Sequence, residues 1–156
     1  MNAELTLKEI LERKRHDWGL RVLAGKSGTG NAVGVADINR PGLALSGYMD
    51  YFAKERIQVL GKTELSYLGR MKSPQRAAIL GRIFKQKIPC IIITRDQKPP
   101  KEILSLADER GIPVISTPFR TTKFISEITV FLEEELAPVK RLHGDLVDVY
   151  GVGALI

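Results

Sequence analysis

Short apolar runs alternate with amphipathic helical patterns along most of the chain. The later runs are apolar almost throughout, which is typical of strands buried on both faces of a parallel sheet. Helical patterns of about ten residues separate them, so the sequence predicts an α/β fold, a mostly parallel sheet flanked by helices. The expected strands are 20–24, 33–38, 56–60, 88–94 and 112–116, and the expected helices are 7–18, 43–45, one from Ser73 with Ala77, Leu80, Ile83 and Phe84 inward, 101–110 and 122–136.

Capping residues mark the ends of several predicted helices. Thr6 can cap the first helix, and Gly19 can end it in the left-handed conformation that glycine adopts readily. Ser73 is expected as the cap of a helix whose first residue is Pro74, where the missing N–H costs nothing. Gly111 should end the helix 101–110.

The C-terminal region reads as the beginning of a second unit. Pro138 is expected to end the last long helix, so we divide the chain into an N-terminal α/β domain, 1–138, and a linker with a first β-hairpin, 139–156. The second strand of that hairpin would run from Val152 to Ile156, with no polar tail behind it. An apolar terminal strand is expected to be continued or paired. We therefore expect the sequence to stop where a further domain begins.

Composition narrows the class of protein. The chain has 156 residues, a net charge of +6 and one cysteine, Cys90, which lies in an apolar run and is expected to be a small core residue. A single cysteine excludes an intrachain disulfide framework and is typical of a reducing compartment. The N-terminus lacks the uninterrupted apolar stretch of a signal peptide, and no run is long enough to span a membrane. The expected location is the cytoplasm.

The positive charge is concentrated in residues 54–101. This segment holds twelve basic and three acidic residues, whereas 102–156 holds five basic and nine acidic. A basic segment can attract nucleic acid, but the residues follow two helical patterns and no aromatic residues are interleaved with them. Solvated helix faces are the simpler interpretation, and no nucleic-acid partner is expected.

Two segments imitate a phosphate-binding loop. Gly25-Lys26-Ser27 and Gly61-Lys62-Thr63 supply the end of the motif G-x-x-x-x-G-K-[ST], but the first glycine is replaced by Leu20 and Arg56. That glycine permits the loop whose amides surround the phosphates. Neither segment is therefore expected to bind a nucleotide. No metal-ligand spacing occurs in the sequence, and no metal site is predicted.

The loop before the last long helix is a candidate anion site. Ligands of parallel sheets bind at the carboxyl ends of the strands, and a helix N-terminus favours anions. Ser116, Arg120, Thr121 and Thr122 would suit a phosphate or a carboxylate. The alternative is that Thr121 or Thr122 caps the helix and that Arg120 is solvated.

Histidine occurs twice, and the second position is the candidate catalytic residue. His16 lies among charged residues and is expected at the surface. His143 begins the terminal hairpin beside Asp145 and Asp148, where an imidazole could transfer a proton near neutral pH.

Several runs together resemble one family, the bacterial HPr kinase/phosphorylases, over nearly the whole chain and in order. The matching runs are DINRPGL at 37–43, GY at 47–48 with YF at 51–52, ERIQVLGKTELSYL at 55–68, IPCII at 88–92, TTKFIS at 121–126 and HGxLVDVYGxGxLI at 143–156.

The resemblance implies a specific activity. The family is a cytoplasmic, hexameric, Mg-dependent enzyme that uses ATP to phosphorylate a serine of the phosphocarrier protein HPr. It also removes that phosphate by phosphorolysis, in carbon catabolite regulation. Its N-terminal domain is similar in fold to the substrate-binding domain of muramyl ligases.

The resemblance also implies that the catalytic site and the N-terminal domain lie in different parts of the enzyme. The catalytic groups belong to the second domain, and of these the histidine alone maps here, onto His143. The glycine-rich loop is expected just beyond Ile156, so the chain alone should neither bind ATP through it nor catalyse transfer. HPr and further copies of the chain are the expected partners, without nucleic acid or membrane. The alternative from another class is a stand-alone regulatory module that binds a small anion or phosphorylated metabolite near Arg120.

Overall fold

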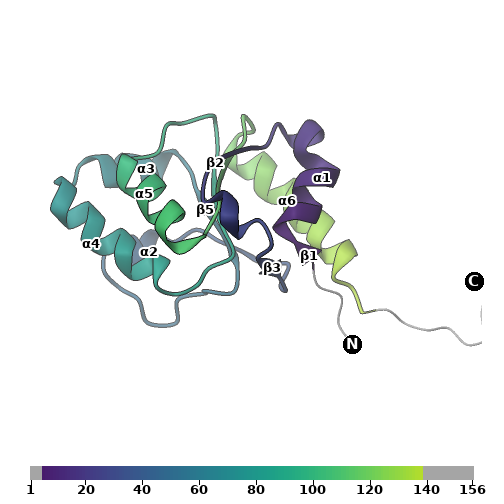
Figure 1. Cartoon of the computed structure of the whole chain (residues 1–156), viewed down its shortest axis with the longest axis horizontal. Helices are drawn as coiled ribbons and strands as arrows, with labels where there is room; N and C mark the ends of the chain where they lie inside the picture. The colour runs from purple at the N-terminus through teal and green to yellow at the C-terminus, as the bar shows by residue number, and fades with distance from the viewer. Residues whose placement is uncertain (1–4, 139–156) are drawn as a thin grey trace, which may run out of the picture.

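The computed structural model describes residues 5–138, and these fold into a sheet with helices on both faces (Figure 1). Helices α1 and α6 lie on one face, and α2 to α5 lie on the other. The elements are β1 (Leu5–Thr6), α1 (Leu7–Trp18), β2 (Arg21–Ala24), the 3-10 turn η1 (Lys26–Gly28), β3 (Ala32–Val33), β4 (Ile38–Asn39), α2 (Gly42–Leu45), β5 (Ile57–Leu60), α3 (Lys62–Gly69), α4 (Ser73–Phe84), β6 (Ile91–Ile93), α5 (Lys101–Arg110), β7 (Val114–Ser116) and α6 (Thr121–Glu135).

The main sheet has five strands in the order β2-β7-β6-β5-β4. The four strands from β4 to β7 are parallel, and β2 runs antiparallel at the edge beside β7. Every residue of β5, β6 and β7 is buried, as expected for strands covered on both faces. The predicted α/β fold with a mostly parallel sheet is confirmed, whereas the predicted C-terminal hairpin lies outside the described residues.

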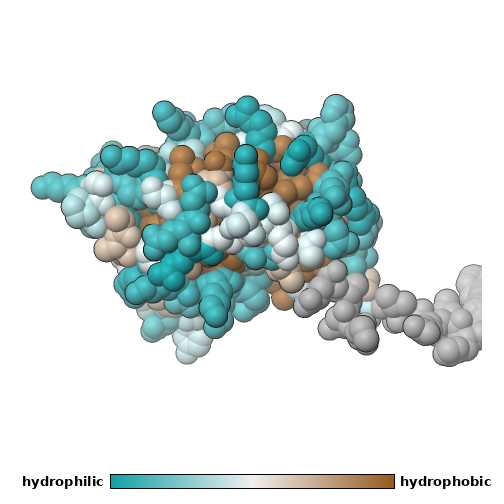
Figure 2. Space-filling model, viewed as in Figure 1, coloured by the Kyte–Doolittle hydropathy of each residue, from teal (hydrophilic) through white to brown (hydrophobic). Residues whose placement is uncertain are grey.

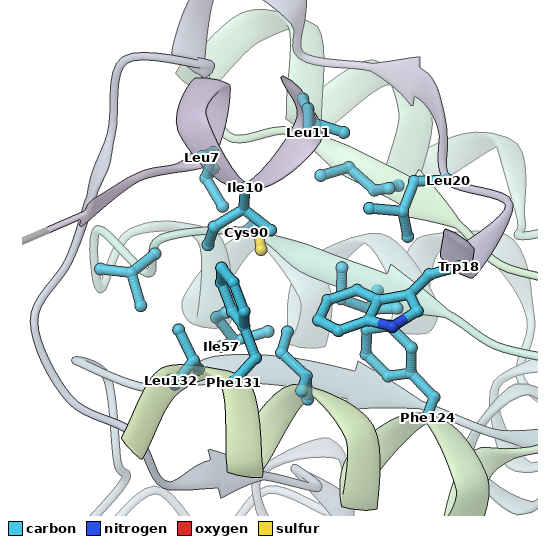
Figure 3. Close-up of a cluster of buried hydrophobic side chains, with 14 of the residues drawn as sticks. Leu7, Ile10, Leu11, Trp18, Leu20, Ile57, Cys90, Phe124, Phe131 and Leu132 are labelled. Carbon is cyan, nitrogen blue, oxygen red and sulfur yellow. The ribbon is translucent and has the colours of Figure 1, made fainter. Parts of the chain in front are cut away.

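Two apolar clusters fill the spaces between the sheet and its helices. In the first, the Trp18 ring lies edge-on to Phe124 and Phe131, with centroid distances of 5.7 and 5.6 Å (Figure 3). Cys90 is completely buried in this cluster, and burial raises the pKa of its thiol. The predicted core role of Cys90 is confirmed. The second cluster joins β5, β6 and β7 to helices α2 to α5.

The predicted strand at 33–38 is wrong in its continuity. Val33 belongs to β3, which pairs with β1 in a separate two-stranded sheet, and Ile38 belongs to β4 in the main sheet. The chain between them passes from one sheet to the other through Gly34, which is exposed. The apolar pattern predicted extended backbone but could not indicate that its two ends pair with different strands.

Other differences concern element ends and one missed helix. Helix α3 was not predicted, because its eight residues contain few apolar positions. Lys72 rather than Ser73 is the N-cap of α4, and Ala77 is exposed rather than inward. Strands β6 and β7 are shorter than predicted because each begins after a proline, which has no N–H for the ladder.

A cluster of charged side chains joins α4 to α5. Arg76 of α4 donates from Nε and Nη2 to the two carboxylate oxygens of Glu102 at 3.0 and 3.1 Å. Its Nη1 donates to the backbone oxygens of Leu68 and Met71 at 2.9 and 2.7 Å. Ser73, whose predicted cap role is replaced by this contact, donates its hydroxyl to the same carboxylate. Hydrogen bonds from Arg76 and then Ser73 lower the pKa of Glu102 to about 2.

The surface is mainly hydrophilic on the face shown in Figure 2, with a band of hydrophobic atoms across its upper middle. None of the helices within residues 5–138 combines the length and the apolar character that a membrane crossing requires.

The Glu102 contacts predict a pH dependence of stability. The pKa of about 2 in the folded state lies below the ordinary value of 4.5, so this stabilisation is present above about pH 4.5 and is lost as the pH falls towards 2. We expect the melting temperature of the wild-type chain to fall over that window, and that of Glu102→Gln to fall less steeply. At pH 7 the Glu102→Gln chain should melt about 5 °C lower. Thermal melts followed by circular dichroism measure both effects.

The control for this prediction is Glu109→Gln, which changes an exposed carboxyl on the same helix. It should melt like the wild-type chain across the window. An equally steep acid transition in Glu102→Gln would contradict the assignment.

Candidate functional site

The carboxyl ends of the four parallel strands meet at one edge of the sheet, where polar residues follow each strand. Arg40 follows β4, Thr94 follows β6 and Thr117 follows β7, whereas Gly61 follows β5 and leads into the polar start of α3. Helix α3 begins after β5 and covers one face, whereas α6 begins after β7 and covers the other. This edge, where parallel sheets commonly bind ligands, is therefore flanked by the starts of two helices.

An ion pair connects β4 with the start of α3. Arg40 donates from Nε and Nη2 to the Glu64 carboxylate at 3.0 and 2.8 Å. The same carboxylate accepts the N–H of Gly61 at 2.9 Å. Burial alone would raise the pKa of Glu64, but the hydrogen bonds from Arg40 and Gly61 outweigh it and the pKa is lowered. The Glu64 side chain is 8 % exposed and that of Arg40 is 41 % exposed, so the pair presents a guanidinium to solvent.

A second polar contact connects β6 with the start of α6. The hydroxyls of Thr94 and Thr121 lie 2.7 Å apart, and both side chains are buried. Helix α6 begins at Thr121, and its N-cap is Arg120, whose side chain makes no capping bond. The predicted cap role of Thr121 or Thr122 is wrong, because the Thr121 hydroxyl is directed into the protein.

Gly61 lies where the two polar contacts approach each other. A Cβ at this position would be 2.6 Å from the Thr121 hydroxyl and 2.9 Å from Nη2 of Arg40. Its backbone angles, φ −104° and ψ −164°, are open to any residue, so close approach rather than conformation requires glycine.

In the two segments that imitate a phosphate-binding loop, the glycine N–H already donates to a carboxylate. Gly61 donates to Glu64, and Gly25 donates to Asp108 at 2.7 Å. A phosphate loop needs such amides free. The geometry agrees with the absence of the first motif glycine.

The predicted anion loop is only partly assembled. Arg120 and Thr122 are exposed at the start of α6, whereas Thr121 and Ser116 are buried. The Ser116 hydroxyl has no hydrogen-bond partner among the described residues. Two of the four residues therefore remain available to a ligand at this place.

A strained turn after β6 was missed by sequence reasoning. Arg95 and Asp96 both have positive φ angles, 61° and 52°. The turn is held by their amides, which donate to the backbone oxygens of Phe119 and Thr117 at 2.9 and 3.0 Å. Consecutive non-glycine residues in this conformation cost free energy and occur often at functional sites. Asparagine, aspartate and glycine are the usual signals, and only Asp96 supplied one.

Of the two histidines in the sequence, one lies within the described residues. His16 is exposed on α1, as predicted, and His143 lies outside the described residues. Within residues 5–138, no group of three or more His, Cys, Asp or Glu side chains is placed to hold a metal ion.

The packing around Gly61 predicts a destabilising substitution. In Gly61→Ala the new methyl group would meet Thr121 and Arg40, so their contacts must separate. We expect a loss of about 1–3 kcal/mol in the free energy of unfolding, measured by urea denaturation.

Gly81→Ala is the matched control, because nothing lies within 4 Å of that Cβ and the residue is inside α4. It should stabilise the chain by about 0.5–1 kcal/mol through helix propensity. Equal effects of the two substitutions would refute close packing at Gly61.

Comparisons with known proteins identify relatives along most of the chain. The chain is 45 % identical over 147 residues to an HPr kinase/phosphorylase of Clostridium perfringens, covering 94 % of this chain and 47 % of that protein. It is 36 % identical over 154 residues to that of Bacillus subtilis, covering 99 % of this chain and 48 % of that protein. The chain thus spans about half the length of the curated relatives it matches.

A solved structure supports the fold. It is the crystal structure of the CBS and DRTGG domains of the regulatory region of Clostridium perfringens pyrophosphatase, complexed with the activator diadenosine tetraphosphate. The TM-score is 0.52 at 16 % identity, covering 87 % of this chain and 55 % of that chain. Such a likeness indicates a shared fold alone.

A model of the family described as HPr serine kinase N terminus matches residues 5–132, nearly the whole described domain. With the identity to curated relatives, this match establishes that the chain belongs to the HPr serine kinase N-terminal family.

Proposed function

We propose that this chain is the N-terminal, assembly or regulatory half of a bifunctional HPr kinase/phosphorylase. The whole enzyme would phosphorylate a serine of HPr with ATP and remove the phosphate by phosphorolysis, in carbon catabolite regulation. The observation that carries the proposal is the match of residues 5–132 to the N-terminal family, with relatives about twice as long. HPr is the proposed protein substrate, and the enzyme is proposed to work in the cytoplasm as a hexamer.

Neither glycine-lysine segment fits the phosphates of ATP. The amides of Gly25 and Gly61 already donate to Asp108 and Glu64, so neither glycine N–H is free for a phosphate. We propose that ATP and magnesium bind in the remainder of the enzyme, and we derive no catalytic step from residues 5–138. The proposed similarity in fold to the muramyl-ligase substrate-binding domain concerns this half.

The Arg40–Glu64 pair and the Thr94–Thr121 contact support a structural role for the carboxyl edge. Both contacts join elements distant in sequence, and their charged and hydroxyl groups are directed mainly at each other. Such an edge can hold a rigid surface towards the rest of the enzyme. Arg40, from the run DINRPGL, and Arg120, from the loop before α6, are exposed cations on this surface.

His143 is the proposed catalytic residue of this chain. It is the position that matches the family's histidine at the entry to the catalytic domain. In that role it would lie near the transferred phosphoryl group, where positioning and charge neutralisation do most of the work.

The test is phosphoryl transfer from ATP to HPr by the complete enzyme and by residues 1–156 alone. We expect transfer by the complete enzyme and none by the chain of 156 residues. His143→Ala in the complete enzyme should lower turnover at least about tenfold, with an unchanged melting temperature.

Gln75→Ala, which changes an exposed residue of α4, is the control and should leave turnover unaffected. Unchanged turnover in His143→Ala would refute the role of the histidine. Transfer by residues 1–156 alone would refute the proposed division of the enzyme.

A further inference from the structure

Strand β2 forms one edge of the main sheet and has a free side. It pairs with β7 alone, from Arg21 opposite Ser116 to Ala24 opposite Val114. No backbone hydrogen bond joins its other side to any residue in the described part of the chain. Free N–H and C=O groups along a strand edge can pair with an extended peptide.

A groove of about 930 Å³ runs between α1 and this free strand. Leu11 of α1 and Val22 of β2 supply apolar surface to it, and Val22 is half-buried. The apolar surface would accept alternate side chains of a peptide lying along the strand.

The walls of the groove are basic. Lys8 and Arg15 come from one face of α1, Lys26 comes from η1, and His16 lies beside them. All four side chains are exposed. Glu12 is the acidic residue lining the groove. The charge therefore favours an acidic occupant.

We propose that β2 and this basic groove bind an extended, acidic segment of a partner protein, which adds to the sheet as a further strand. Its backbone would pair with the free side of β2, its apolar side chains would contact Leu11 and Val22, and its carboxylates would face Lys8, Arg15 and Lys26. This binding function is separate from the proposed phosphoryl transfer.

A second copy of the chain fits this surface less well. Pairing of β2 with β2 would bring the same cations together, including the exposed Arg21 on the strand itself. The ladder register also shifts between Val22 and Ala24, which bends the edge. Charge and irregularity at a strand edge oppose pairing with an identical strand, whereas an acidic strand relieves the charge.

The experiment uses residues 1–156 and a fluorescent eight-residue peptide, Thr-Glu-Thr-Val-Thr-Glu-Thr-Val, whose Glu and Val side chains all point to one face when it is extended. Binding is followed by anisotropy at about 0.1 M salt. The triple variant Lys8→Glu, Arg15→Glu, Lys26→Glu should weaken binding at least about tenfold. The control variant Arg70→Glu, Lys72→Glu, Lys98→Glu reverses the same number of exposed charges elsewhere and should change the affinity less than about threefold.

Two further peptides test strand addition itself. Each carries N-methyl groups on alternate residues, in opposite registers, so each removes the N–H groups along one side of the peptide. One register should weaken binding at least about tenfold and the other should not. Hydrogen exchange at the amides of residues 21–24 that do not donate to β7 should slow when the unmodified peptide binds.

Four results would overturn the proposal. These are no binding of the peptide, equal weakening by the two charge-reversal variants, equal effects of the two N-methyl registers, and slow exchange, before peptide is added, at the amides of residues 21–24 that do not donate to β7. The last result, combined with a dimer in sedimentation equilibrium, would assign the edge to a second copy. Without a dimer it would assign the edge to another segment of the same chain.

Discussion

Burial of β5, β6 and β7 on both faces is the constraint on which the rest of the structure depends. Strands without an exposed side chain need apolar cover above and below the sheet. Helices α1 and α6 supply one cover, and α2 to α5 supply the other. The chain must therefore cross from one face to the other, first between α1 and α2 and again between β7 and α6, at the carboxyl edge.

That crossing creates the candidate site. Because α3 begins on one face and α6 on the other, Gly61 and Thr121 are brought together across the end of the sheet. Close packing there leaves no room for a side chain at Gly61. The polar groups pair with one another, Arg40 with Glu64 and Thr94 with Thr121. The polar groups of this edge are thus largely satisfied by one another. The free side of β2 has the opposite character, with open backbone groups beside basic side chains.

Hydrophobic periodicity predicted the helices that bury one apolar stripe and the strands that are buried on both faces. The long helices α1 and α6 have apolar stripes, and the strands β6 and β7 are apolar throughout, so both were recognised. Helix α3 was missed because it has few apolar positions and because Glu64 at its start contacts Arg40, which lies 24 residues earlier in the chain. The strand expected at 33–38 failed because pairing partners, and not local preference, decide which sheet each end joins. Ser73 is a residue type that often caps helices, but its hydroxyl donates to Glu102 of helix α5.

By itself the sequence determined the fold class, the family and the core position of Cys90. These depend on local pattern and on motif spacing, which a linear chain displays directly. Tertiary structure alone decided that Thr121 would turn inward to Thr94, that Gly61 would occupy the closest approach, and that β2 would pair on one side only within residues 5–138. Each of these is a relation between residues that are distant in sequence, and only the packing of helices on both faces of the sheet brings them into contact.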